Sequence, residues 1–163
     1  MNIRIGQSTD IHQLLSNEKL ILGGVEIESD LGTVAHSDGD ILVHAITESI
    51  IGALGKGDLG TWFSDEDNSN KNRSSLEMLK EVVAYMKQVN YSICNIDTLI
   101  LVEKPKIKKY SDMMKTNICK VLEIENDLLN IKATRGEKIG FVGRREGIVA
   151  QAVTLLVKNG EKQ

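Results

Sequence analysis

The sequence predicts an α+β fold, a single-domain α/β sandwich spanning residues 1–163 in which helices stack on one face of a mixed sheet. Two observations predict it. Strand-like segments are interspersed along the chain with segments of helical period, instead of being grouped apart. The chain has 163 residues, of which 41% are hydrophobic, and it shows no internal repeat or long linker, so one compact core is expected.

Strands are expected where apolar residues alternate with polar ones or form β-branched runs. These segments are residues 2–8, 20–28, 96–102 and about 129–135. Gly23-Gly24 lies inside the second segment and indicates a bulge or a close approach of the backbone.

The first helix is expected over residues 40–54, where apolar residues recur with helical period. Ser37 or Asp38 can cap its start, and Gly55 or Gly57 can end it.

Three more helices and one loop complete the expected order. A capping-box pattern predicts a helix from residue 74 to about 89, and Pro105 opens a helix to about residue 122. The last helix is expected over about 146–158. Residues 64–74 are rich in Asp, Asn and Ser and predict an exposed, mobile loop.

The composition excludes several classes of protein. Twenty basic and 23 acidic residues give a net charge of −3, which argues against the basic face that nucleic-acid binding requires. Cys94 and Cys119 are too few for a disulfide scaffold and indicate a reducing compartment. No apolar run approaches the roughly 20 residues of a membrane span. With no signal sequence visible, a cytoplasmic location is expected, although a transit peptide removed before residue 1 would lie outside this sequence.

All three histidines lie in two short acidic blocks, Asp10-x-His12 and residues 36–44. On a strand, Asp10 and His12 share a face, and His44 lies one turn into the first helix, where it can point back toward the sheet. Each residue alone would be read as an ordinary turn or surface residue. Together, one carboxylate and two imidazoles match a catalytic zinc with an open coordination position.

The residues before the first helix indicate a phosphate site. Backbone N–H groups at a positive helix end, with the hydroxyl of Ser37, suit an anion. An ordinary N-cap would explain Ser37 and Asp38 but not His36. We interpret Asp38 and Asp40 as residues that hold a zinc-bound imidazole in place without binding the metal themselves.

Two later blocks carry further candidates. The glycine-rich residues 55–60 and the acidic residues 63–67 can approach a ligand and accept hydrogen bonds from its hydroxyls, or can be a turn and a solvated loop. In residues 132–138, Glu137 is an oxygen ligand of the kind that Mg²⁺ or Mn²⁺ takes beside phosphates. A surface ion pair of Glu137 with Lys138 or Arg135 is the alternative.

With these blocks in order, the chain resembles the 2-C-methyl-D-erythritol 2,4-cyclodiphosphate synthase family over residues 2–158. The motifs that carry the resemblance are Arg4-Ile5-Gly6, Asp10-x-His12, Ala35-His36-Ser37-Asp38-Gly39-Asp40 with His44, Gly57-Asp58-Leu59-Gly60, Lys132-Ala133-Thr134 with Glu137, and Gly140-Phe141-x-Gly143-Arg144-x-Glu146-Gly147. The chain departs from the family pattern at Thr9, at Ser64 and at Arg135-Gly136.

The resemblance implies the residues of the site. Asp10, His12 and His44 would bind zinc, and Glu137 would bind a second ion, Mg²⁺ or Mn²⁺. His36 and Arg135 are the expected catalytic residues, with Arg135 standing where the family has a hydroxyl. The expected substrate contacts are Asp10, His12, His36, Ser37, Asp58, Leu59, Gly60, Phe63, Asp65, Asp67, Val102, Pro105, Lys106, Ile107, Lys108, Ala133, Thr134, Arg135, Glu137, Phe141 and Arg144.

The resemblance also implies a lyase of non-mevalonate isoprenoid biosynthesis. The 2-phosphate of the substrate would attack the β-phosphorus of the cytidine diphosphate group in the same molecule. CMP would leave, and no protein nucleophile would take part. The family forms homotrimers with sites between subunits, which would put Arg144 and Glu146 near the threefold axis, a candidate site for an isoprenoid ligand. The alternatives are a zinc phosphoester hydrolase, with His36 or Asp38 as base, and a non-catalytic metal- or nucleotide-binding protein.

Overall fold

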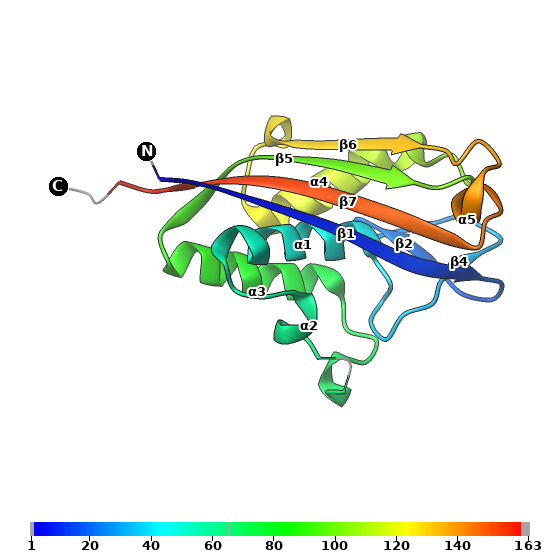
Figure 1. Ribbon diagram of the computed structural model, residues 1–163, viewed down its shortest axis with the longest axis horizontal. Helices are drawn as coiled ribbons and strands as arrows, with labels where there is room; N and C mark the ends of the chain where they lie inside the picture. The colour runs from blue at the N-terminus through cyan, green and yellow to red at the C-terminus, as the bar shows by residue number, and fades with distance from the viewer. Residues whose placement is uncertain (1, 65, 161–163) are drawn as a thin grey trace.

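The computed structural model describes residues 2–64 and 66–160. In these ranges one sheet has the strand order β4-β1-β7-β5-β6, and β2 pairs with β3 in a separate hairpin (Figure 1). The strands are β1 (Ile3–Leu15), β2 (Leu20–Leu22), β3 (Val25–Ile27), β4 (Gly32–Thr33), β5 (Tyr91–Leu101), β6 (Leu129–Thr134) and β7 (Gly147–Lys158). The β5–β6 pair is parallel, while β1 pairs antiparallel with β4 and β7, and β5 with β7, so the expected mixed sheet is confirmed.

The helices are α1 (Ile41–Leu54), α2 (Leu59–Trp62), α3 (Ser75–Gln88), α4 (Ser111–Leu122) and α5 (Gly140–Gly143), with 3-10 turns η1 (Asn68–Asn70), η2 (Ile107–Tyr110) and η3 (Asn126–Leu128). The three long helices, α1, α3 and α4, cover one face of the sheet, as expected. Helix α1 packs on β1 and β7, α3 packs on α1 and β5, and α4 packs on β6 (Figure 1). Among the described residues, no helix is long and apolar enough to cross a bilayer.

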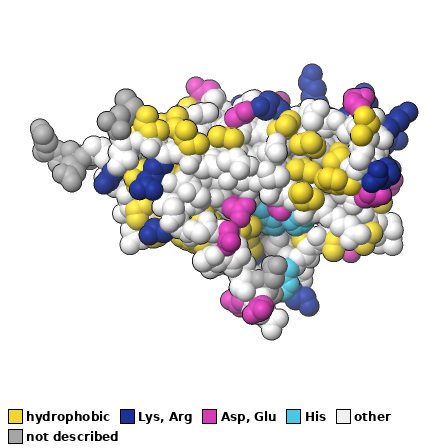
Figure 2. Space-filling model, in the orientation of Figure 1, with side chains coloured by type: hydrophobic (Ala, Val, Ile, Leu, Met, Phe, Trp, Pro, Cys, Tyr) yellow, Lys and Arg dark blue, Asp and Glu magenta, His cyan; other side chains and the backbone are white. Residues whose placement is uncertain are grey.

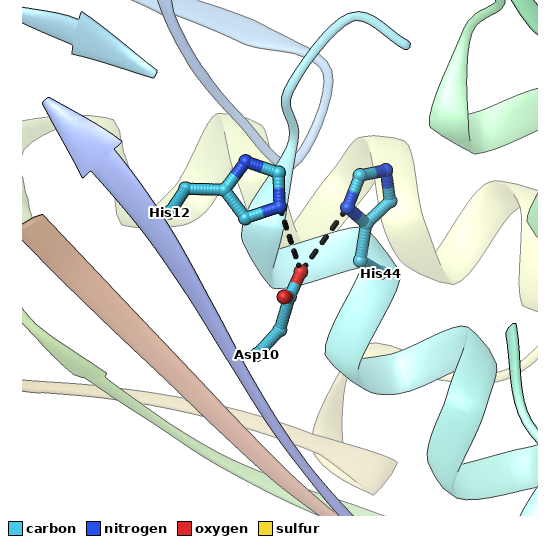
Figure 3. Close-up of side chains that lie close together, drawn as sticks. All are labelled: Asp10, His12 and His44. Carbon is cyan, nitrogen blue, oxygen red and sulfur yellow. Dashed lines mark hydrogen bonds and ion pairs between the residues drawn. The ribbon is translucent and has the colours of Figure 1, made fainter. Parts of the chain in front are cut away.

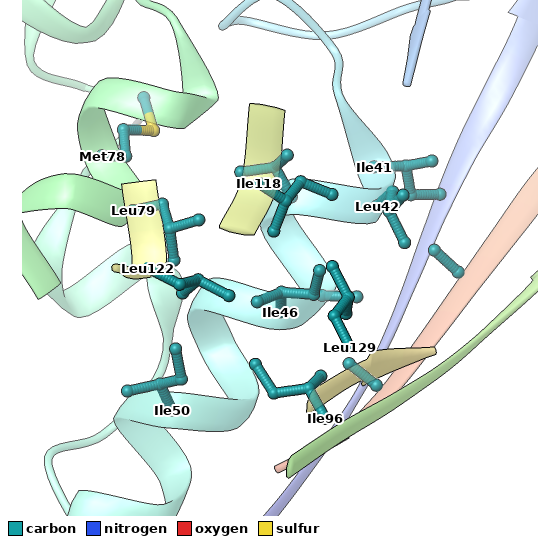
Figure 4. Packing of buried hydrophobic residues seen from close by; sticks show 14 of the residues in the cluster. Ile41, Leu42, Ile46, Ile50, Met78, Leu79, Ile96, Ile118, Leu122 and Leu129 are labelled. Carbon is teal, nitrogen blue, oxygen red and sulfur yellow. The ribbon is translucent and has the colours of Figure 1, made fainter. Parts of the chain in front are cut away.

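The core lies between the sheet and these helices. Ile46 and Ile50 of α1 meet Ile96 and Leu129 of the sheet and Ile118 of α4 (Figure 4). Gly6 sets the closeness of this packing, because a Cβ at that position would lie 1.8 Å from the backbone oxygen of Ser49. The backbone of α1 therefore lies directly against β1.

The other face of the sheet is not covered by the long helices α1, α3 and α4. Odd-numbered residues of β1 point to it, and Ile3, Ile5 and Ile11 are exposed there, as is Val153 of β7. Figure 2 shows hydrophobic side chains gathered over the strands. Because even-numbered residues of β1 point to the helices, Asp10 and His12 face α1.

The expected last helix at 146–158 is wrong. These residues form β7, which lies between β1 and β5 and pairs with both. Ile148, Ala150 and Ala152 face the helices, and Val149 on the opposite face is also buried. From Gly147 to Ala150 the strand is buried on both faces. Such a segment carries apolar residues continuously, which removes the alternation that identifies a strand.

Several boundaries of strands and helices also differ from those predicted. Residues 20–28 form the β2–β3 hairpin rather than one strand, with Gly23-Gly24 at its turn, and β1 and β5 are longer than expected. The helix assigned to Pro105 begins at Ser111, because Lys106 is still extended and η2 intervenes. The 64–74 loop contains the single turn η1.

The caps at the helix starts differ as well. Ser74 precedes α3 but its side chain makes no capping bond, so the capping box is wrong. Asp38 accepts the N–H of Ser75 in its place, at 3.0 Å. Asp40, rather than Ser37 or Asp38, caps α1, while Gly55 ends that helix as expected.

Candidate metal centre

Asp10, His12 and His44 converge where β1 passes α1 (Figure 3). Oδ2 of Asp10 lies 3.2 Å from Nε2 of His12 and 3.2 Å from Nδ1 of His44. One ligand atom from each residue lies within 4.8 Å of the others. The strand spacing brings the first two residues together, and the α1–β1 contact at Gly6 brings the third, so the expected cluster exists.

The electrostatics of the cluster suit a cation. Burial acts to raise the pKa of Asp10, but hydrogen bonds and charge from His12 and His44 outweigh it and hold that pKa well below its usual range. Asp10 is therefore a carboxylate, the state that a metal ligand needs.

The outer nitrogens of both imidazoles are also engaged. Nδ1 of His12 lies 3.1 Å from the carbonyl oxygen of Val34, so it is assigned as the N–H donor and Nε2 faces Asp10. Nε2 of His44 lies 2.8 Å from Oγ of Ser75 and 3.1 Å from Oγ of Ser37. Such contacts fix the orientation of metal-binding imidazoles.

The two acids expected to support the cluster have different roles. Asp38 accepts a hydrogen bond from Oγ of Ser75 and so reaches His44 through that hydroxyl. Asp40 instead accepts the N–H groups of Gly23 and Gly24 and that of Val43. The role expected of Asp40 is corrected: it ties the β2–β3 turn to the start of α1.

Three protein ligands leave room for a further ligand. In the described part of the chain, the ligand cluster consists of Asp10, His12 and His44. It borders a cavity of about 380 Å³, so the metal position faces open space rather than a fourth protein ligand. These residues fit a catalytic ion better than a structural one.

The cavity joins residues from three separate sequence blocks. Besides the metal cluster, its walls include His36, Ser37, Leu59, Gly60 and Phe63. Nε2 of His36 is buried and has no hydrogen-bond partner among the described residues. Figure 2 shows histidine side chains in a hollow beside the α2 region.

The acidic candidates Asp58 and Asp67 accept hydrogen bonds from residues two or three positions further along the chain. Asp58 accepts the N–H and the hydroxyl of Thr61, at 2.8 and 2.6 Å, and these bonds lower its pKa. Asp67 accepts the N–H of Ser69 at the start of η1. Asp65 lies outside the described residues.

The expected nucleotide residues form a separate cavity at the ends of β5 and β6. It has a volume of about 160 Å³ and is lined by Val102, Glu103, Pro105, Lys106, Ile107, Lys108, Ala133, Thr134 and Arg135. A larger cavity of about 720 Å³ adjoins it and adds Lys104 and Lys138 opposite Glu28 and Asp30. Lys and Arg side chains gather at this end of the molecule (Figure 2).

Glu137, Phe141 and Arg144, which were expected in the site, also lie outside these cavity walls. Glu137 is exposed in the turn after β6, with a positive φ of 50°. Phe141 is exposed and lies near Gly147. Arg144 makes a two-bond ion pair with Glu146, at 2.9 and 3.0 Å.

Sequence reasoning missed two residues of the metal region. Ser75 was read only as part of a capping box, although it contacts His44. Glu48 lies one turn beyond His44 and accepts hydrogen bonds from Oγ of Ser8 and the N–H of Leu59, which ties the 58–60 segment to α1 and β1. The spacing of Glu48 from His44, and of Ser8 from Asp10, was the available signal.

Comparisons with known proteins agree with this arrangement. A family model described as the YgbB family matches residues 3–157. A protein of Clostridium acetobutylicum named 2-C-methyl-D-erythritol 2,4-cyclodiphosphate synthase is 51% identical over 155 residues, which cover 95% of this chain and 100% of that protein. A protein of Fusobacterium nucleatum with the same name is 47% identical over 156 residues, 96% of this chain and 98% of that protein.

Two solved structures have the same fold. The Plasmodium falciparum IspF–CDP complex superposes with a TM-score of 0.86 at 34% identity, covering 98% of each chain. The bifunctional IspDF of Campylobacter jejuni gives a TM-score of 0.93 at 37% identity, covering 97% of this chain and 43% of that one.

Proposed function

The chain belongs to the YgbB family, and from that membership we propose the reaction of its site. The protein converts 4-diphosphocytidyl-2-C-methyl-D-erythritol 2-phosphate to 2-C-methyl-D-erythritol 2,4-cyclodiphosphate, releases CMP, and acts in isoprenoid biosynthesis. The observation that carries the proposal is the cluster of Asp10, His12 and His44 at the edge of a cavity that also contains His36 and Ser37. We treat residues 1–163 as one catalytic domain.

The metals of the proposed reaction are zinc and Mg²⁺ or Mn²⁺. Asp10, Nε2 of His12 and Nδ1 of His44 would hold the zinc, since their ligand atoms already converge. Glu137 would hold the second ion. When bound, these ions offset the charge of the phosphates and polarise phosphoryl oxygens.

The chain's own residues bind and orient the substrate. The unpartnered Nε2 of His36 and the hydroxyl of Ser37 suit a phosphate oxygen at the cavity wall. Leu59 and Gly60 would lie along the erythritol, and Arg135 would offset diphosphate charge. Because both reacting groups belong to one molecule, holding them in line contributes on the order of several kcal/mol to catalysis, and no protein nucleophile is required.

The proposed active assembly is a homotrimer. Within one chain, the metal cavity and the nucleotide cavity have separate walls, so residues 102–108 and 133–137 of one subunit would complete the metal site of the next. The uncovered sheet face, with Ile3, Ile5 and Ile11, supplies an apolar surface for assembly. In such a trimer CDP would bind between subunits, and an isoprenoid ligand near Arg144 and Glu146.

Turnover in ¹⁸O-labelled water tests the reaction. Cyclisation uses a phosphate oxygen of the substrate as nucleophile, so CMP and the cyclic diphosphate should contain no solvent oxygen. Label in a phosphorylated product would identify a zinc hydrolase instead. Binding of CDP without any turnover would leave only a metal- and nucleotide-binding protein.

A further inference from the structure

A chain of buried and half-buried polar groups lies behind His44, on the side opposite to Asp10. Nδ1 of His44 faces Oδ2 of Asp10 at 3.2 Å, and Nε2 faces Oγ of Ser75 at 2.8 Å. Ser75 is fully buried and His44 is 7% exposed. Beyond Ser75, Asp38 accepts both its hydroxyl and, at 3.0 Å, its backbone N–H.

The directions of these hydrogen bonds follow from the donors and acceptors. If Nδ1 is a metal ligand, it carries no proton, so Nε2 carries the proton and must donate. The hydroxyl of Ser75 accepts that proton and gives its own to Asp38, because a carboxylate only accepts. Every polar atom in the chain Asp38–Ser75–His44 is then paired, which fixes the rotation of the hydroxyl and of the ring.

We propose that Ser75 is a positioning residue of the metal centre. Its hydroxyl holds the imidazole of His44 with Nδ1 directed at the metal position, and Asp38 in turn orients that hydroxyl. Ser75 is the first residue of α3, so this contact joins the start of α3 to the ligand set formed by β1 and α1. The proposal rests on the metal role of His44 within the proposed function.

A second hydroxyl, that of Ser37, also faces Nε2 of His44, at 3.1 Å. It differs from Ser75 in two ways. Ser37 lies in a partly exposed loop, and its oxygen also accepts the N–H of Gly39 at 3.3 Å. We therefore assign the main acceptor to Ser75, with Ser37 as the weaker one.

Zinc affinity, measured by competition with a chelating dye, tests this role without any turnover. Ser75→Ala removes the hydroxyl, while Asp38 can still accept the N–H of residue 75 and cap α3. Zinc should bind roughly 10- to 100-fold more weakly to this variant. Ser74→Ala is the matched control: it truncates the preceding serine, whose side chain makes no capping bond, and should bind zinc like the parent.

The ring N–H signals in the zinc-loaded protein supply the second measurement. The chain has three histidines, so nitrogen-15 labelling of histidine gives few signals. The Nε2–H proton of His44 should exchange slowly with water in the parent and in Ser74→Ala, and faster in Ser75→Ala. The proposal requires both the weaker zinc binding and the faster Nε2–H exchange of Ser75→Ala.

Three results of the zinc titrations would overturn the proposal: parental zinc affinity in Ser75→Ala, equal losses of affinity in Ser75→Ala and Ser74→Ala, or a larger loss in Ser37→Ala than in Ser75→Ala. Unchanged exchange of the Nε2–H proton in Ser75→Ala would do the same. A parent protein that binds zinc as expected but forms no cyclic diphosphate would instead refute the proposed function alone.

Discussion

The metal cluster and the nucleotide cavity are built in opposite ways on the same sheet. In the metal cluster, contacts within the chain already fix the side chains, as the bonds of His12 to Val34 and of His44 to Ser75 illustrate. At the ends of β5 and β6, by contrast, Lys106 and Arg135 are exposed around an open cavity. One half of the proposed site is therefore formed by folding, and the other half awaits its ligand and, by our proposal, a neighbouring subunit.

His44→Ala should have the largest effect, because it removes a ligand from the half that folding forms. Loss of the ion removes several kcal/mol of transition-state stabilisation, so turnover should fall roughly 1,000-fold or more. Zinc content and product formation measure the effect, and circular dichroism should report a largely unchanged fold. Full activity in metal-free His44→Ala would break the assignment of the cluster.

Ile5→Asp should disrupt the assembly that completes the nucleotide half of the site and leave the metal cluster intact. Ile5 is 69% exposed on the uncovered sheet face, whereas Asp10 and His12 point to the other face of β1. A charge at the centre of an apolar contact should weaken association by roughly 30-fold or more per interface. Light scattering should show dissociation and turnover should fall, while each monomer retains zinc.

Ile5→Val is the control for that experiment and should remain a trimer. A parent protein that is monomeric by light scattering and still turns over at high dilution would contradict the shared site.

Arg135→Ala tests the open half at a single residue. If Arg135 contacts the diphosphate mainly in the transition state, the chemical step should slow by roughly tenfold to a thousandfold. Arg135→Thr should recover much of the loss, because a hydroxyl stands there in the family pattern. Rapid-mixing measurement of a single turnover isolates this step from product release.

Glu137→Gln is the companion variant, since losing the second ion should cost activity that added Mg²⁺ does not fully restore. Parental kinetics in Arg135→Ala beside a strong defect in Glu137→Gln would keep the ion site and discard the role of the arginine.

Asp40→Ala should have the smallest effect of these variants, and the quantity it changes is the free energy of unfolding. Burial raises the pKa of Asp40 to about 6 although the N–H groups of Gly24, Gly23 and Val43 act against the shift. Since the unfolded value is near 3.8, the folded protein binds more protons between these values, and its free energy of unfolding falls as pH rises through that window.

Urea unfolding at several pH values measures this slope, which should be reduced in Asp40→Ala. The variant should also be less stable by about 1–3 kcal/mol, because three N–H groups lose their acceptor. An unchanged slope would mean that another group titrates in this window.

The cluster of Asp10, His12 and His44 could be predicted from the sequence because local geometry decides most of its placement. Asp10 and His12 share a face by strand alternation alone, and His44 follows from the start of a well-marked helix. The family resemblance, the fold class and the reaction are confirmed by the comparisons. The substrate contacts and the trimer stay predictions.

The errors arose where a distant partner decides the structure. Asp38 takes the cap of α3 from 37 residues away, so the pattern at Ser74 was misleading and the role of Ser75 was hidden. β7 was read as a helix because its first residues are buried on both faces, while β1 and β5, which pair with its two edges, are far away in the sequence. No local pattern contains those neighbours.

The close contact at Gly6 has a consequence for the choice of ion. Backbone atoms of β1 and α1, rather than flexible side chains, act as the spacer between Asp10 and His44, so the donor atoms keep their separation whichever ion arrives. The metal-free protein should therefore accept Co²⁺ without refolding. The visible absorption of the bound Co²⁺ would then report on the nitrogen and oxygen donors of the site, which zinc leaves spectroscopically silent.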